Sequence, residues 1–497
     1  MLSLIASVFE KVSILATTAL SFVGTPIFWA VAAAFVLFMY VSGIGKRWLV
    51  ALYGEFTPAE LLKFGLLAAA FFLIIGSYWT LRSIKDAFFD YLVGYKHVWM
   101  AKIVTVFAMI PIIGAYNKLV DCMSREKLFW VICGFYSTLF VLCGLAYVNL
   151  NSPFFALGDG LFNWLPGKAI TSDGIQLFGL SRFLGWAAFI VVETMGGIIV
   201  ALFWSYTHST TRTELGKRGY PLVYIAAQAG NLAGPTLATY AELLGFLGLF
   251  LIAAGVLMII PVVIHLYKTL VPEDLRQTDG SATAVKKKST GAFEAFRLMG
   301  KHPYLMGLAF VATVYEIVGT LIDFQFKMTA SQVFSKEALA AYLGQYGQYT
   351  ASVGLTFAIL GTSFVVRRLG VRWSLLVYPM LLGGIVVMVR FFPVLNVLFW
   401  AMVCVKMLSY ALNNPVKELM YIPTSKDVKF KVKAVIDGFG GKFAKAAGSL
   451  INGSINPAML VAYGSMASLG IIGIWIMIAV VVGKTYDELV ENKQILE

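Results

Sequence analysis

Long apolar segments recur along almost the whole of this sequence and restrict its fold more than any other feature. They lie at residues 24–44, 61–82, 98–117, 128–149, 183–206, 219–238, 243–266, 303–323, 350–367, 373–391, 393–413, 434–455 and 464–483. A helix of about 20 apolar residues crosses the hydrocarbon core of a bilayer. Charged residues make up only 13% of the chain, whereas soluble proteins carry about 25%. Because no strand alternation typical of a β-barrel is visible, we predict an all-α polytopic membrane protein.

Lysine and arginine gather in alternate loops between the apolar segments. The richer loops lie at 118–127, 212–218, 268–301, 367–372 and 417–433, and the poorer ones at 150–182, 239–242 and 324–349. Cytoplasmic loops of membrane proteins collect basic residues, so we expect the richer set and the C-terminus in the cytoplasm. This alternation predicts twelve helices, six on each side of a long central loop, as in secondary transporters built from two related halves.

The net charge of +13 has two interpretations. It reflects this topology, since basic loops face the cytoplasm, or it marks a pathway for an anionic substrate. For charges in the loops the first interpretation is favoured, and for charges inside the apolar segments the second.

Five parts of the chain follow from this layout. An N-terminal hydrophobic extension, residues 1–54, is expected to add a thirteenth helix over 25–45. A signal peptide is the alternative, although the run is long, is followed by Lys46 and Arg47, and lacks an obvious cleavage site. The other parts are an N-terminal six-helix half (55–266), a central cytoplasmic loop (267–302), a C-terminal six-helix half (303–485) and a cytoplasmic tail (486–497).

The sequence offers no motif of an enzyme or an ATP-driven pump. The segment VVGKT (481–485) resembles the end of a phosphate-binding loop, but it lacks the first glycine and closes an apolar segment. Four cysteines and four histidines show no metal-ligand spacing, so we expect no metal and no cofactor. A polytopic membrane enzyme or an assembly protein stays an alternative class, and it would need a catalytic cluster facing one side of the membrane.

Ionisable residues inside the apolar segments form the candidate site. At membrane depth such groups are costly, so they face the protein interior and usually serve transport. They are Arg82, Lys85, Asp86, Asp90, Lys102, Glu193, Glu316, Asp323, Lys406, Lys442 and Lys445. Arg82 and Asp86 are four residues apart on one helical face and are expected to pair. Lys85 lies about 100° away around a helix and is expected to be the free cation.

Small residues are enriched in the fifth helix expected of each half, at 226–238 and 437–454. They permit close helix packing or leave room for a ligand, and the pattern does not separate these roles. In the second of these segments Lys442 and Lys445 are one turn apart. Two cations on one helical face among small residues indicate a pocket for a polyanion.

Three segments resemble the nucleotide transporter family, the ATP/ADP translocases of obligate intracellular bacteria and of plastids. They are TLRSIKD (80–86), GKRGYPLVYIAAQAGNLAG (216–234) and NPVKELMYIPTSKDVKFKVKAVIDGFGGKFAKAAGSL (414–450). The likeness spans about residues 55–485, and its most specific part is the KELMYIP…KAVID block. It implies a major-facilitator-like bundle of about twelve helices that exchanges ATP for ADP.

The resemblance also implies four functional positions. The family's important charged residues fall on Lys85, Glu193, Glu316 and Lys445. The block that usually reads DPxKEMAYIPL departs from that pattern here at Asn414, Leu419 and Thr424. Because some relatives import nucleotides with protons or carry NAD, proton-coupled import of nucleotides or NAD stays an alternative, as does a carrier of another organic phosphate.

The mechanism expected from these residues is alternating access by two half-bundles, with substrate phosphates bound between Lys85 and Lys445. Glu193 and Glu316 are expected to pair with the lysines in the empty carrier, which favours obligate exchange because the empty carrier reorients poorly. Arg82 and Lys442 would add to the positive electrostatic field at the site or form contacts that gate it. Coupling or gating roles are assigned to Asp86, Asp90, Asp323 and Lys406, and candidates for stacking on the base are Tyr78, Phe88 and Tyr315.

The expected setting is the bacterial inner (cytoplasmic) membrane. The expected partners are the transported nucleotides and the lipid bilayer. We expect no nucleic acid as a partner, and we expect the protein to be a monomer.

Overall fold

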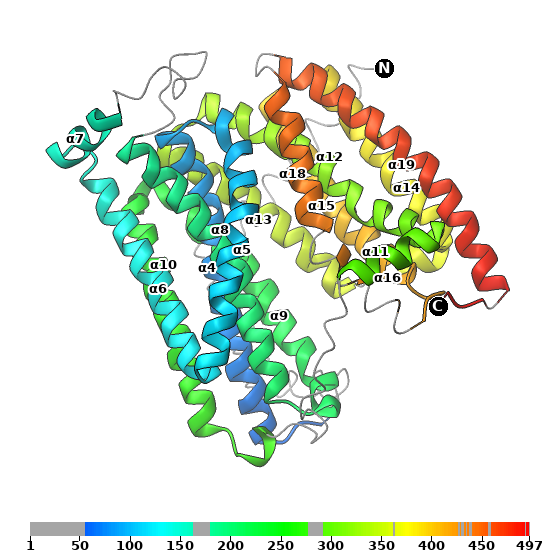
Figure 1. Ribbon diagram of the computed structural model, residues 1–497, viewed down its shortest axis with the longest axis horizontal. Helices are drawn as coiled ribbons and strands as arrows, with labels where there is room; N and C mark the ends of the chain where they lie inside the picture. The colour runs from blue at the N-terminus through cyan, green and yellow to red at the C-terminus, as the bar shows by residue number, and fades with distance from the viewer. Residues whose placement is uncertain are drawn as a thin grey trace. The chain divides into compact units, whose positions relative to one another are not determined.

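The computed structural model describes most of the chain, and its described residues are nearly all helical (Figure 1). They are residues 55–162, 179–276, 292–360, 363–425, 428, 432–433, 435–436, 440–455, 459–492 and 494–496. The expected N-terminal extension and residues 277–291 of the central loop lie outside them. Within the described ranges no β-strand occurs, apart from one isolated bridge between Thr424 and Leu496. The prediction of an all-α fold is therefore confirmed.

Most helices coincide with the apolar segments, whereas Pro153–Phe162, Ala292–Lys301 and the first part of Lys336–Leu360 lie where loops were expected. In the first half they are α4 (Pro58–Leu92), α5 (Val98–Cys122), α6 (Arg125–Val148), α7 (Pro153–Phe162), α8 (Leu180–Ser209), α9 (Thr213–Ala238) and α10 (Ala241–Leu270). In the second half they are α11 (Ala292–Lys301), α12 (Pro303–Val333), α13 (Lys336–Leu360), α14 (Ser363–Phe391), α15 (Leu395–Leu408), α16 (Asn414–Leu419), α18 (Gly441–Ser454) and α19 (Leu460–Glu491). Short turns of other helix types are η2 (Tyr95–His97), η3 (Asp274–Arg276) and the π-helical turn η5 (Ser409–Asn413).

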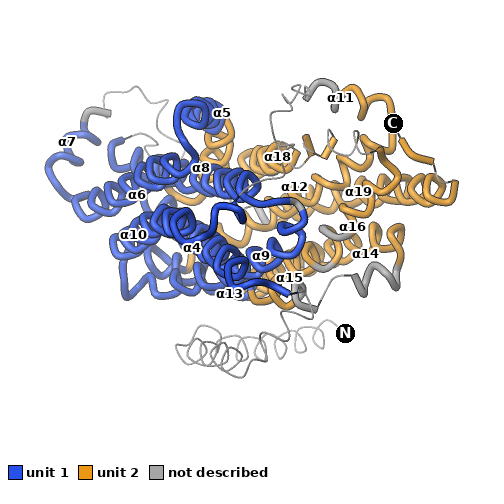
Figure 2. Tube along the Cα trace, turned by 90° about the horizontal axis from the view of Figure 1, so that it is seen from below, with its two compact units in different colours: residues 1–93, 109–283, 334–351 blue, residues 94–108, 284–333, 352–497 orange. Residues whose placement is uncertain are grey.

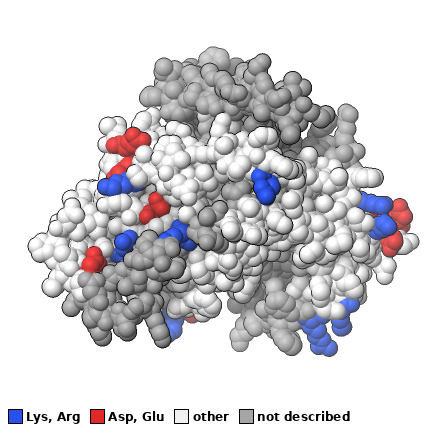
Figure 3. Space-filling model, turned by 90° about the horizontal axis from the view of Figure 1, so that it is seen from above, with Lys and Arg blue, Asp and Glu red and all other residues white. Residues whose placement is uncertain are grey.

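Within the described residues, eight helices are long and apolar enough to cross a membrane, judged by length and composition. They include α4, α6, α8, α10 and α12, and the segments Tyr95–Cys122, Gly370–Phe391 and Ala462–Glu491. Charged side chains cover only a small part of the described surface visible in Figure 3. The helices α9 and α13 are of comparable length, with 26 and 25 residues, but do not reach that apolarity. The total of twelve spans stays a prediction.

The chain forms two compact units (Figure 2). Unit 1 comprises residues 1–93, 109–283 and 334–351, and unit 2 comprises residues 94–108, 284–333 and 352–497. The segments 94–108 and 334–351 thus each belong to a unit different from the one that flanks them in sequence. The expected boundaries of the two sequence halves stay a prediction.

Helix α4 is the packing centre of unit 1 and contacts α8, α9 and α10. Its start is fixed by a capping box, in which the Thr57 hydroxyl accepts from the backbone of Glu60 while the Glu60 carboxylate accepts from the backbone of Thr57. Further along, the backbones of α4 and α9 approach closely, because side chains at Gly230 and Gly234 would collide with the α4 backbone. The Thr80 hydroxyl also joins the two helices, because it donates a hydrogen bond to the Gly234 carbonyl at 3.0 Å.

Helix α12 is the corresponding centre of unit 2 and contacts α15, α18 and α19. Gly448 on α18 faces the backbone of α12 at Ile317, where a side chain would collide. Four residues further on, the Asn452 amide donates to the Thr320 carbonyl at 3.2 Å. In both units the small residues therefore serve close helix packing, and on α18 this packing brings Lys445 towards α12.

One lysine near the start of α4 was not singled out in the sequence. The Lys63 side chain is completely buried, and its ammonium donates to the carbonyls of Thr210 and Leu275, each at 2.7 Å. Thr210 is the C-cap residue that follows α8, where free carbonyls make a cation favourable. Lys63 thus joins three segments of unit 1 and serves the fold.

Candidate functional site

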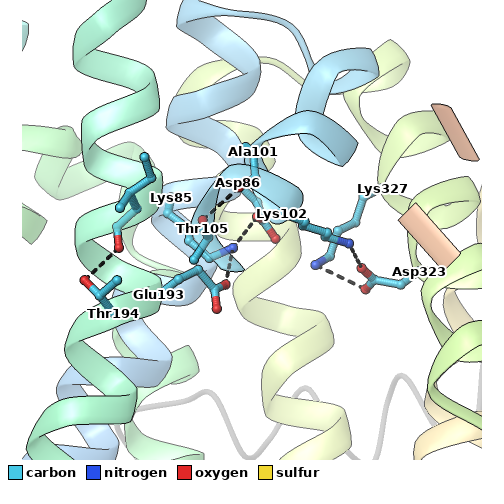
Figure 4. Close-up of polar contacts among 10 residues, drawn as sticks. Lys85, Asp86, Ala101, Lys102, Thr105, Glu193, Thr194, Asp323 and Lys327 are labelled. Atoms are coloured by element: carbon cyan, nitrogen blue, oxygen red, sulfur yellow. Dashed lines mark hydrogen bonds and ion pairs between the residues drawn. The ribbon is translucent and has the colours of Figure 1, made fainter. Parts of the chain in front are cut away.

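A buried lysine of α4 forms the centre of the charged cluster in unit 1. The Lys85 ammonium lies 2.6 Å from Oδ1 of Asp86 and 3.0 Å from Oε1 of Glu193 on α8 (Figure 4). The Lys85 and Asp86 side chains are each 3% exposed, whereas the Glu193 side chain is 32% exposed. The cation is therefore enclosed, and the carboxylate of Glu193 is its more accessible neighbour.

Aromatic rings of α4 and α8 line the same cluster. The Lys85 ammonium lies 4.1 Å from the centre of the Phe189 ring, and the Arg82 guanidinium lies 4.8 Å from the centre of the Trp79 ring. Both are cation–π contacts, which are stronger where water is excluded. On α8 a side chain at Gly196 would collide with the ring of Tyr78. Gly196 therefore allows this ring to lie against α8, just beyond Glu193.

The expected pairing of Lys85 with Glu193 is confirmed, but Lys85 is not the free cation that the helical geometry predicted. That geometry compared the directions of the first side-chain bonds of Lys85 and Asp86. The flexible stem of a lysine spans the difference, and its ammonium reaches the carboxylate of the next residue. Arg82 stacks on Trp79, and Asp86 is engaged by Lys85.

The charged pair of unit 2 joins α12 to α18. The Lys445 ammonium lies 3.6 Å from Oε1 of Glu316, with side-chain exposures of 53% for Lys445 and 18% for Glu316. The hydroxyl of Tyr315 donates to the same Oε1 at 2.6 Å. This confirms the expected pairing of Glu316 with Lys445, and it adds a neutral partner that the sequence did not assign.

The second cation expected on α18 lies at the surface. Lys442 is exposed and makes no ion pair with a residue that the structure describes. It is three residues before Lys445, about one turn of the same helix. Both lysines thus lie near the start of α18. Lys445 has a long contact with Glu316, and Lys442 is exposed at the surface.

A second charged group in unit 2 surrounds Asp323 on α12. Lys102 lies 3.5 Å from its Oδ2, and Lys327 lies 3.1 Å from its Oδ1 (Figure 4). The sequence placed Lys327 in a loop, and this prediction was wrong because α12 continues to Val333. The available signal was the four-residue spacing of Asp323 and Lys327, which allows an ion pair on one helical face.

Two further charged candidates lie near helix ends. Asp90 is half-buried near the end of α4, and Lys406 is half-buried in the last turn of α15. The gating or coupling roles assigned to them, and to Asp86 and Asp323, stay predictions.

The three candidates for base stacking lie in different surroundings. Phe88 is fully buried and its ring lies 5.3–5.7 Å from those of Tyr147, Phe246 and Phe250. It is a core residue of unit 1 rather than a ligand for a base. Tyr78 is half-buried against Gly196, and the hydroxyl of Tyr315 is bound to Glu316.

Residues 46–486 match the sequence profile of the TLC ATP/ADP transporter family. The chain belongs to this family. Membership confirms the resemblance inferred from the KELMYIP…KAVID block, and it confirms a membrane transporter rather than an enzyme.

Curated relatives extend along most of the chain. ADP,ATP carrier protein 1 of Rickettsia bellii is 26% identical, with 87% of this chain and 95% of the relative covered. ADP,ATP carrier protein 1 of Rickettsia typhi is 25% identical, with 87% and 95% covered. The plastidic ATP/ADP-transporter of Solanum tuberosum is 24% identical, with 81% of this chain and 68% of the relative covered.

Solved structures share the fold at low sequence identity. A bacterial homologue of the iron transporter ferroportin in an inward-facing state aligns with a TM-score of 0.56 and 14% identity, covering 86% of this chain and all of that one. A bacterial homologue of the human lysosomal transporter Spinster aligns with a TM-score of 0.52 and 13% identity, covering 88% of this chain and 99% of that one. These likenesses confirm the major-facilitator-like fold.

Proposed function

We propose that this protein exchanges nucleotides across a membrane, ATP for ADP, by alternating access. The observation that carries the proposal is a lysine in each unit that lies against a glutamate from a neighbouring helix. Lys85 lies beside Glu193, and Lys445 lies beside Glu316. Membership of the TLC ATP/ADP transporter family and relatives named as ADP,ATP carrier proteins support nucleotides as the substrate.

The two lysines are proposed as ligands of the substrate phosphates. A lysine binds phosphate as a compact point charge, and a nucleotide tail of two or three phosphates engages more than one. When a phosphate binds, it replaces the glutamate at the ammonium. When it leaves, Glu193 and Glu316 neutralise the lysines again, which avoids bare charge inside the protein. We propose that only the loaded protein releases these pairs readily enough to reorient, so that transport is an obligate exchange.

Uptake of labelled ATP into liposomes preloaded with ADP tests this function. We expect uptake to require internal nucleotide and to be lost in Lys85→Ala and strongly reduced in Lys445→Ala. Lys217→Ala is the matched control, because Lys217 is an exposed lysine whose ion pair within the described residues is with Glu214 on its own helix. Normal transport by both site variants would remove the two lysines from the proposed site.

The same liposomes separate exchange from the alternatives that the sequence left open. Accumulation in unloaded liposomes only under an inward proton gradient would replace exchange by proton-coupled import. Stabilisation by ligands in a thermal-shift panel of ATP, ADP, GTP, UTP, NAD and sugar phosphates identifies the substrate class. Stabilisation by sugar phosphates and not by nucleotides would overturn the assignment to nucleotides.

We further propose that the protein is a monomer in a bacterial cytoplasmic membrane, with a bundle of twelve spans, an additional N-terminal hydrophobic helix and its C-terminus in the cytoplasm. The alternation of basic loops supports the twelve spans of the bundle and their orientation. The test is a C-terminal fusion to a reporter enzyme that works only in the periplasm. We expect no reporter activity, and activity would contradict this orientation.

A further inference from the structure

Two donors meet one carboxylate oxygen in unit 2. The Tyr315 hydroxyl is 2.6 Å from Oε1 of Glu316, and the Lys445 ammonium is 3.6 Å from that same atom. The first distance is typical of a strong hydrogen bond from a hydroxyl to an ionised carboxylate. The second is longer than a normal hydrogen bond. Tyr315 therefore holds this oxygen more closely than Lys445 does.

The two charged side chains, Lys445 and Glu316, also differ in how exposed they are. Lys445 is 53% exposed, whereas Glu316 is 18% exposed. An ammonium that leaves the pair keeps its hydration, but a carboxylate with little access to water needs another donor to stay charged. Tyr315 precedes Glu316 on α12 and supplies that donor whether or not Lys445 is present.

We propose that Tyr315 is a positioning residue that stabilises Glu316 when Lys445 turns to a substrate phosphate. This inference rests on the proposed function. In it, Tyr315 sets how strongly Glu316 competes with the substrate phosphate for Lys445. Without the hydroxyl, the close partner left to Glu316 among the described residues is Lys445, and the lysine is given up less readily. The hydroxyl thus raises the affinity for nucleotide without touching it.

The test measures KM and Vmax for ADP-driven ATP uptake by Tyr315→Phe. Loss of a hydrogen bond to a charged group is expected to raise KM by about tenfold, with Vmax nearly unchanged. The matched control is Tyr304→Phe on the same helix, because the Tyr304 hydroxyl donates to the Met420 carbonyl at 2.6 Å and to no carboxylate. The control is expected to keep the KM of the unaltered protein.

A double variant separates positioning from a structural role. In the Glu316→Gln background, where the Glu316 carboxylate no longer competes for Lys445, adding Tyr315→Phe is expected to leave KM unchanged. A rise of the same size in that background, or equal KM values for Tyr315→Phe and Tyr304→Phe, would overturn the inference.

Two further measurements keep the test decisive. If Tyr315→Phe fails to reach the membrane, Glu316→Gln alone reads the same competition, and its KM is expected to fall below that of the unaltered protein. An unchanged or higher KM for Glu316→Gln would then count against the inference. If the unaltered protein exchanges no nucleotide, the proposed function fails, whereas normal exchange with an insensitive Tyr315 removes only the role of Tyr315.

Discussion

The charged pairs of the two units are built from the same residue types but hold their lysines differently. In unit 1 the additional partner binds the cation, since Asp86 joins Glu193 at the Lys85 ammonium. In unit 2 the additional partner binds the anion, since Tyr315 joins Lys445 at Oε1 of Glu316. In each case the additional partner is the adjacent residue on the same helix. Its position decides which member of the pair is restrained.

The lysines of the two pairs also differ in burial, and the lysine with the additional partner is the more buried one. The Lys85 side chain is 3% exposed and Lys445 is 53% exposed. Removing one member of a buried ion pair leaves an uncompensated charge, whereas an exposed pair contributes little to stability. Lys85 is thus expected to matter for both folding and transport, and Lys445 for transport alone.

The largest effect is expected for Lys85→Ala. The carboxylate of Asp86 loses the close ammonium, and Glu193 loses its partner, so unfolding free energy is expected to fall by about 3–5 kcal/mol. Exchange is expected to fall by at least about 100-fold. Thermal unfolding in detergent and liposome uptake measure the two effects. Glu193→Gln added to Lys85→Ala is expected to recover part of the stability and none of the exchange, and an unchanged melting temperature for Lys85→Ala would contradict the comparison.

Lys445→Ala is expected to reduce exchange by about 10-fold to 100-fold, the range for a lost charge-assisted contact. Its unfolding free energy is expected to stay within about 1 kcal/mol of the original, because the pair is exposed on the lysine side. The same two assays apply. A loss of stability equal to that of Lys85→Ala would show that the two units hold their lysines alike.

Lys442→Ala is expected to have a smaller effect, a rise in KM of about threefold, because a solvated charge acts through the local potential. This effect is expected to weaken as salt is raised, since exposed charges are screened. Lys442→Arg keeps the charge and serves as the control. A change in KM larger than that of Lys445→Ala would reverse the ranking of these two cations.

The smallest effect on exchange is expected for Lys63→Met, although this lysine is as buried as Lys85. The carbonyls of Thr210 and Leu275 lose a charged donor, so unfolding free energy is expected to fall by about 1–3 kcal/mol. KM is expected to stay unchanged, as uptake by the surviving protein would show. A raised KM with normal stability would move Lys63 from the fold to the transport site.

The helical class and the two glutamate–lysine pairs could be predicted from the sequence because both follow from the cost of polar groups in lipid. Long apolar segments predict helices, and isolated charges within them require partners. Glu193 and Glu316 met that condition, and each lies beside a lysine. The family resemblance rested on three segments, and the most specific of them was 414–450.

The finer geometry of the site could not be predicted because it depends on side-chain reach and rotamers. Lys85 reaches the adjacent Asp86 although the two residues point in different directions from the helix. The direction of the Tyr315 hydroxyl is set by its rotamer, which no spacing pattern encodes. Phe88 was a candidate for stacking on a base, and only the rings of Tyr147, Phe246 and Phe250 around it identify it as core.

The close approach of α9 to α4 has a consequence for how this protein can vary. At Gly230 and Gly234 even a methyl group would meet the backbone of α4, so these two positions admit one amino acid for reasons of space alone. A saturation library selected only for folded protein in the membrane would return glycine at both positions and would accept diversity at the exposed Lys217. In a screen for transport, losses at these two glycines would report a failed helix contact, without any bearing on substrate chemistry.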